Sequence, residues 1–262
     1  MKPSSFVIGT LLWLAASHDV FAQSADELAK QTQNPVASLI SVPFQGNWDV
    51  GIGTREAIGT TLNIQPVAPF SLTKTVNVIL RVIMPLVSSP TDDEDLRING
   101  MSDTVATAFL SPAHTGKLIW GVGPVLLLPT ATNNSLGSEQ VGLGPSIVAL
   151  VQPGHWTIGL LWNQIWSMDG PPDRTEVNRG FFQPFANYNL PDGLAVGASL
   201  EATANWDEDQ IWNSPLVFTL SKVTVLGKRP VNFVVGAGPL IASPDGGAEW
   251  RLRVQANFLF PR

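Results

Sequence analysis

The residues able to do chemistry in this chain are few, and their spacing does not predict a catalytic centre. Hydrolysis by a nucleophile needs a serine or similar group beside a histidine, with a third group that orients the histidine. Beyond residue 22 the sequence holds two histidines, His114 and His155, each in a short turn-forming stretch without those partners. The chain has no cysteine, and two isolated histidines are a poor metal site. We therefore expect no enzyme activity, no cofactor and no metal ion, with a hydrolase as the least favoured alternative.

A second set of polar residues occupies alternate positions of otherwise apolar segments, which favours a solute path. The candidates for this path are Arg81, Asn163, Gln183, Asn187, Glu201, Asn205, Arg251 and Arg253. Three arginines against one glutamate would favour anionic or hydrogen-bonding solutes. The alternative is a structural network of ion pairs and amides across the interior, in which Glu201 pairs with Arg253.

The elements that must position these residues are β-strands. The closing segment, WRLRVQANFLFPR, is apolar at every second residue from Trp250 to Phe260, and most residues between them are strongly polar. This alternation is typical of a strand with one apolar and one polar face. The question is whether the apolar face meets a protein core or a lipid bilayer.

Composition narrows the class of protein. Charged residues make up 14% of the 262 residues, against roughly 25% in soluble domains. The most apolar run, residues 6–16, is shorter than the roughly 18 residues of a membrane-spanning helix. Its position after Lys2 and before Ala22 predicts a secretory signal peptide over residues 1–22. The net charge of −6 gives no basic surface for nucleic acid.

Short turns alternate with longer polar connections along the mature chain. That order is typical of an all-β fold, a transmembrane up-and-down antiparallel β-barrel of about twelve strands. The expected strands are 37–52, 60–68, 76–86, 103–110, 118–128, 141–151, 156–166, 181–189, 194–205, 211–221, 231–241 and 249–260. We expect residues 37–262 to form this barrel, with short turns and both termini on the periplasmic side and the longer loops outside.

Two features indicate that the apolar face meets lipid. The polar face carries asparagine, glutamine, serine, threonine and glycine with few charges, unlike a surface in bulk water. Tryptophans lie near strand ends, and the ten residues from Trp156 to Trp166 span roughly 25 Å in a tilted strand, the height of a lipid-facing band. The expected membrane girdles contain Trp120, Trp156, Trp166, Trp206, Trp212 and Trp250.

The Gly-x-Gly-Pro sequence occurs three times, at residues 121–124, 142–145 and 236–239. A dinucleotide-binding loop needs a third glycine and a following helix, and neither is present. We interpret the repeats as small residues on one strand face.

The closing strand also predicts how the barrel is inserted. Phe258 and Phe260 place aromatic residues at the end of the last strand, the pattern that the barrel-assembly machinery reads. The expected partners are this machinery, outer-membrane lipid and a small-molecule solute, and the expected location is the outer membrane.

Several stretches resemble a bacterial family of outer-membrane barrels that is named after the MetA pathway of phenol degradation and is sometimes mislabelled neuromedin U. They include NPVASLISVPFQ, LNIQPVAPFSL, GKLIWGVGP, LLPTAT, QPFANYNLPDG and TANW. The similarity runs from about Asn34 to Phe260. It implies a barrel that transports small molecules, among them aromatic compounds, and brings no catalytic or binding motif with it.

Three alternatives stay open. The helix-prone residues 23–36 form either a plug inside the barrel or a mobile periplasmic segment. The acidic pairs and runs at Asp92–Asp95 and Asp207–Glu208 are either solvated loop charge or sites for a cation or partner. A structural or adhesive barrel without transport competes with the pore.

Overall fold

The computed structural model describes residues 25–91, 93, 96–207, 212–227 and 229–261. The expected signal peptide and most of the acidic run at 92–95 therefore lie outside the described residues. The strands are β1 (Ile40–Ile52), β2 (Ala57–Ile64), β3 (Val67–Ser71), β4 (Val76–Pro90), β5 (Arg97–Met101), β6 (Thr104–Pro112), β7 (Leu118–Leu128), β8 (Val141–Val151), β9 (Trp156–Asp169), β10 (Asn178–Asn189), β11 (Leu194–Leu200), β12 (Ala202–Asn205), β13 (Trp212–Leu226), β14 (Arg229–Ala242) and β15 (Trp250–Phe260). A short 3-10 helix spans Asn134–Leu136, and residues 25–32 form an α-helix.

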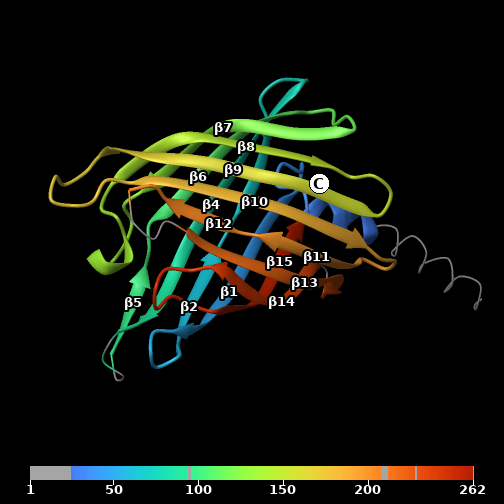
Figure 1. Ribbon diagram of the computed structural model, residues 1–262. Helices are drawn as coiled ribbons and strands as arrows, with labels where there is room; N and C mark the ends of the chain where they lie inside the picture. The colour runs from blue at the N-terminus through green and yellow to red at the C-terminus, as the bar shows by residue number, and fades with distance from the viewer. Residues whose placement is uncertain (1–24, 92, 94–95, 208–211, 228, 262) are drawn as a thin grey trace, which may run out of the picture.

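These strands form one closed antiparallel barrel (Figure 1). Each strand pairs with its neighbours in sequence, and β15 returns to pair with β1. Three consecutive pairs, β2 with β3, β5 with β6 and β11 with β12, continue one another along shared neighbours. The barrel therefore has the twelve transmembrane strands that the sequence predicts. Among the described residues, no helix is long and apolar enough to cross a membrane.

The outer surface of the barrel is apolar all the way round. Val254 in the middle of β15 is 51% exposed, and Phe218 on β13 is 56% exposed. Large apolar side chains are similarly exposed on most of the other strands, among them Ile58, Leu80, Leu110, Leu126, Ile147, Leu160, Phe182 and Val196. A water-soluble protein rarely exposes a continuous apolar surface of this size, so this face meets hydrocarbon.

The interior is polar on only part of the wall. The inward residues of β6 to β9 form two apolar clusters, centred on Phe109 with Leu150 and on Val125 with Ile165. The sequence prediction of an interior lined by polar residues is wrong for this sector. The sequence of β7, LIWGVGPVLLL, shows why: both its odd and its even positions are apolar. One apolar face of this strand packs inside the barrel, and the other meets lipid.

The three Gly-x-Gly-Pro repeats share one structural cause. In each repeat the second glycine lies against a backbone carbonyl oxygen of a neighbouring strand: that of Ala108 for Gly123, of Gln164 for Gly144 and of Leu216 for Gly238. A Cβ on that glycine would lie 1.7–1.8 Å from this oxygen in all three repeats. Only glycine fits at these positions.

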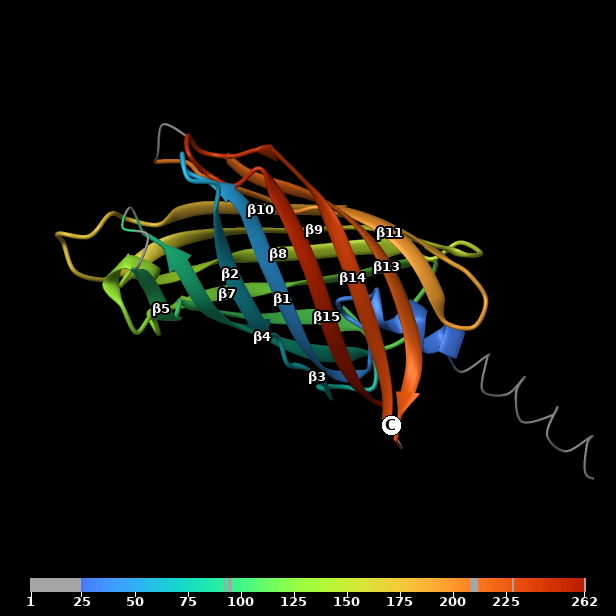
Figure 2. The same ribbon diagram turned by 90° about the horizontal axis from the view of Figure 1, so that it is seen from below.

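Both ends of the described chain lie at the same mouth of the barrel (Figure 2). Ile40 pairs with Phe260 at this end, which also carries the short turns. Residues 25–39 lie at the same mouth and pack against it (Figure 1). The helix contacts the 190–193 turn, where the backbone N–H of Gly193 donates to Asp26 Oδ1 at 2.5 Å. We call this mouth the turn end and the opposite mouth the loop end.

Candidate functional site

The centre of the lumen holds an ion-pair network. Arg253 on β15 donates from Nη1 and Nη2 to the two carboxylate oxygens of Glu201, at 2.6 and 2.7 Å, and from Nε to Asn47 Oδ1 at 2.8 Å. Glu201 lies between β11 and β12, so β13 and β14 separate the partners along the wall. The pair therefore reaches across a sector of the lumen, as the structural alternative in the sequence predicts.

Two further arginines complete this network. Arg251 forms a bidentate pair with Asp49 on β1, with Nε–Oδ1 and Nη2–Oδ2 distances of 2.6 and 2.8 Å, and its Nη1 lies 3.4 Å from Glu201 Oε2. Arg81 on β4 donates to Gln65 Oε1 at 2.8 Å. We call Asp49, Arg81, Glu201, Arg251 and Arg253 the charge layer. Three arginines against two carboxylates leave it with one formal positive charge.

The remaining predicted path residues also lie on inward positions of their strands. Gln183 donates to Glu201 Oε1 at 3.4 Å, and Asn187 lies on the same strand nearer the turn end. Asn163 occupies an inward position of β9 opposite Ser146, on the apolar sector. Asn205 lies near the loop end. The structure thus brings Arg81, Gln183, Glu201, Arg251 and Arg253 together and leaves Asn163 and Asn205 apart.

Sequence reasoning missed two members of the central network, Asn47 and Asp49. Their signal was present in β1, where the polar residues Gln45, Asn47 and Asp49 alternate with apolar Phe44, Trp48 and Val50. Asp49 changes the electrostatics, because it neutralises Arg251 and lowers the excess positive charge that the sequence indicated.

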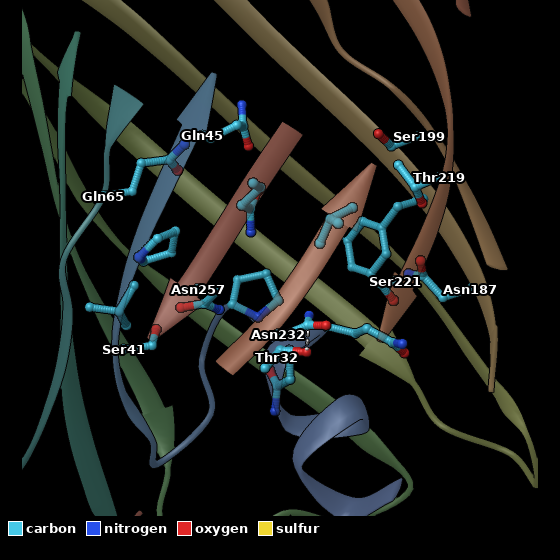
Figure 3. Close-up of a pocket in the computed structure, with 18 of the residues that line it drawn as sticks. Thr32, Ser41, Gln45, Gln65, Asn187, Ser199, Thr219, Ser221, Asn232 and Asn257 are labelled. Atoms are coloured by element: carbon cyan, nitrogen blue, oxygen red, sulfur yellow. Dashed lines mark hydrogen bonds between the residues drawn. The ribbon is translucent and has the colours of Figure 1, made fainter. Parts of the chain in front are cut away.

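A cavity of about 250 Å³ lies between the charge layer and the turn end (Figure 3). Most of its wall comes from strands β1, β3, β4, β10, β11, β13, β14 and β15, and residues 31–39 supply its floor. The residues labelled in Figure 3 are amides and hydroxyls: Thr32, Ser41, Gln45, Gln65, Asn187, Ser199, Thr219, Ser221, Asn232 and Asn257. Below the charge layer this wall carries no ionised side chain.

The N-terminal segment is held at the turn end by specific contacts. Gln33 and Asn189 form a reciprocal amide pair, with N–O distances of 2.9 and 3.2 Å. Lys30 Nζ donates to the carbonyl oxygen of Gly154 at 2.7 Å. Val36 is buried in the apolar cluster that contains Phe109. Residues 25–39 therefore occupy the turn end of the barrel and reduce its opening.

The loop end contains a second polar region. Asp103 accepts hydrogen bonds from the backbone N–H and the hydroxyl of Ser138, both at 2.7 Å, and so anchors the 129–140 loop. Arg174 in the 170–177 loop binds carbonyl oxygens of Asn134 and Gly137 and pairs with Glu139 at 3.3 Å. These contacts hold two outer loops against each other over the apolar sector.

The predicted girdle tryptophans all expose their side chains on the outer surface. Their exposed fractions lie between 39% and 50%. Trp120 and Trp156 are near the turn end, and Trp166, Trp206, Trp212 and Trp250 are near the loop end, as their positions at the ends of their strands show. In the last strand, Phe258 packs edge-on against Phe44, with ring centroids 5.9 Å apart, and Arg229 lies 4.8 Å from the ring centre of Phe260.

His114 and His155 lie away from the charge layer and the cavity. His114 lies in the exposed turn before β7, and His155 Nδ1 lies 3.0 Å from the carbonyl oxygen of Asn189 at the turn end. Within the described ranges, no three histidine, cysteine or acidic side chains are grouped to hold a metal ion.

Comparisons with known proteins identify the class to which this architecture belongs. No family model and no curated protein matches the sequence. Among solved structures, the outer membrane channel from Pseudomonas putida F1 superposes with a TM-score of 0.64 at 18% identity, covering 85% of this chain and 94% of that chain. The fold is that of an outer-membrane β-barrel.

Two other structures are more distant. Outer membrane phospholipase A from Escherichia coli has a TM-score of 0.46 at 11% identity, covering 90% of this chain and 98% of its own. The CymD monoaromatic hydrocarbon channel has a TM-score of 0.48 at 11% identity, covering 92% and 93%. At these scores neither structure bears on the function.

Proposed function

We propose that this protein is an outer-membrane pore that passes small solutes by diffusion through the barrel lumen. The observation that carries the proposal is the inside-out barrel: an apolar surface for lipid encloses a cavity lined by amides and hydroxyls. The similarity in fold to the Pseudomonas putida channel supports the same assignment. Phe258 and Phe260 are proposed as the signal for the barrel-assembly machinery.

The charge layer sets the ionic preference of this pore. Its one excess positive charge favours anions weakly over cations, because fixed charges that line a narrow pore select the opposite sign. Arg251 is neutralised by Asp49 and Arg253 by Glu201. Arg81 therefore carries the one excess positive charge. Among the described contacts, Arg81 is the one arginine of the layer that donates to no carboxylate, because its hydrogen bond goes to the amide of Gln65.

Reconstitution of the purified chain into planar lipid bilayers tests the proposal. We expect discrete conductance steps and a reversal potential that indicates a preference for chloride over potassium. Arg81→Ala should remove this preference, whereas Lys117→Ala, which removes one positive charge from an exposed turn, should leave it unchanged. Membranes that stay impermeable to ions and to small uncharged solutes contradict the pore.

A structural barrel without transport is the second candidate. The cross-lumen pair of Arg253 and Glu201 favours it, because this pair ties distant parts of the wall together. The same bilayer experiment separates the two functions, since a structural barrel gives no current even when it is correctly folded and inserted.

A further inference from the structure

The cavity below the charge layer contains many polar side chains that have no partner in the protein. Within the described part of the chain, the polar lining side chains that make no hydrogen bond include these seven: Ser41, Gln45, Asn187, Ser199, Thr219, Ser221 and Gln255. The charge layer directly above differs, because each of its members is hydrogen-bonded. The cavity wall is therefore available to bind whatever enters it.

The chemistry of these side chains defines the kind of solute. Amides and hydroxyls both donate and accept hydrogen bonds, and none of the seven carries charge. They come from opposite parts of the wall: Gln45 from β1, Asn187 from β10 and Thr219 from β13 (Figure 3). A solute that satisfies them must present both donors and acceptors around its whole edge.

The wall also has apolar patches at which a ring could lie. Phe185 lines the cavity between Gln183 and Asn187 on β10, and Val67 and Val234 line it from β3 and β14. Aromatic rings and methyl groups pack against the C–H faces of a solute but form no hydrogen bond with its hydroxyl groups. A cyclic polyol has this composition, with hydroxyls at its edge and C–H groups on its faces.

The size of the cavity limits the solute. About 250 Å³ corresponds to about eight water molecules at roughly 30 Å³ each. This volume accommodates one sugar ring.

Two amide oxygens on β14 and β15, next to the floor, are also without a partner. Asn232 Oδ1 and Asn257 Oδ1 are buried without a hydrogen-bond partner among the described residues. Asn232 is fixed in orientation, because the Thr32 hydroxyl donates to the carbonyl oxygen of Ala29 at 2.8 Å and must accept from Asn232 Nδ2 at 3.1 Å. Its Oδ1 is then an acceptor that lacks a donor among the described residues.

We propose that this cavity is a binding site for an uncharged polyhydroxyl solute, a single sugar ring or smaller. This proposal names a class of solute for the proposed pore. The binding site itself does not depend on the pore function, but the passage of the bound solute through the barrel does. The one excess positive charge of the charge layer disfavours the binding of cations. The uncharged wall of the cavity disfavours the binding of a solute that carries a full negative charge.

Equilibrium binding to the detergent-solubilised full chain, measured by saturation-transfer NMR, tests the site. D-xylose should bind with a dissociation constant at least about tenfold lower than tetrahydropyran, which has the same ring without hydroxyls, since several hydrogen bonds contribute. If tetrahydropyran, phenol or the anion xylonate binds as well as D-xylose, the proposal is overturned.

Variants locate the binding. Thr219→Val keeps the side-chain shape and removes one hydroxyl, and it should weaken D-xylose binding on the order of threefold to tenfold. Thr224→Val makes the same change on the same strand at an exposed position outside the cavity, and it should bind D-xylose as the unmodified chain does. Equal affinity in the two variants overturns the site, whichever solute binds.

Ion conductance of the same preparations separates this proposal from the pore. Conductance without D-xylose binding leaves the pore and removes the site. D-xylose binding without conductance leaves the site and removes the pore.

Discussion

Replacing Glu201 by glutamine is the most informative perturbation of the interior. Glu201 accepts two short hydrogen bonds from Arg253, at 2.6 and 2.7 Å, and both side chains are largely buried, with 15% and 6% of their surface exposed. Removing one partner of a buried pair costs about 3–5 kcal/mol, because the other charge remains buried without compensation. The lumen lets water approach Arg253, so we expect the lower limit, about 3 kcal/mol.

Urea unfolding of the barrel in lipid vesicles measures this loss. Glu139→Gln is the matched control, because Glu139 pairs with Arg174 in outer loops where about a third of each side chain is exposed, and such pairs contribute under about 1 kcal/mol. The double variant Glu201→Gln with Arg253→Met should recover most of the lost stability, since it removes the uncompensated charge. If Glu201→Gln costs no more than Glu139→Gln, the network does not stabilise the barrel and the reasoning fails.

Three further predictions concern the wall and its floor. Val254→Arg places a charge on the lipid face and should destabilise the inserted barrel by about 2–4 kcal/mol, whereas Gln255→Arg, one residue on and facing the lumen, should cost much less by the same unfolding assay; equal losses would contradict the assigned faces. Gly238→Ala places a Cβ 1.7 Å from a backbone oxygen, so we expect the heat-modifiable folded band on gels to be lost, whereas Gly116→Ala, which meets no atom within 4 Å, should fold normally. A chain without residues 25–33 should show a larger single-channel conductance, because the cavity loses part of its floor; an unchanged conductance would mean that these residues do not restrict the path.

The alternation of polar and apolar residues was sufficient to predict the barrel and its strands. Each strand has one face in lipid, so a two-residue period is imposed on nearly every segment. The inward position of Arg81, Glu201, Arg251 and Arg253 followed from this period alone. The pairing of Glu201 with Arg253 followed from charge, since no other acidic residue stood among the predicted path residues.

The apolar sector was beyond the reach of this pattern. In β7 both alternations are apolar, and the period cannot tell an inward isoleucine such as Ile119 from an outward leucine such as Leu118. The packing of Val36 into that sector depends on the N-terminal segment entering the barrel, and a short helix carries no signal for its docking site. Thr107 faces the lumen, since it lies opposite the inward-facing Arg81 in the register of β4 and β6.

The pairing of the first and last strands has a consequence for how the protein is made. Asn47 faces Arg253 and Asp49 faces Arg251 across β1 and β15, the two ends of the chain's sheet. These contacts can form only when the newly made cylinder shuts, after every other strand is in place. A shift of the β1–β15 register by two residues in either direction would separate Arg251 from Asp49. The guanidinium of Arg251 would then lie in the lumen without its Asp49 partner. The pairing of β1 with β15 therefore favours its own native register, and a barrel that closes in another register is less stable.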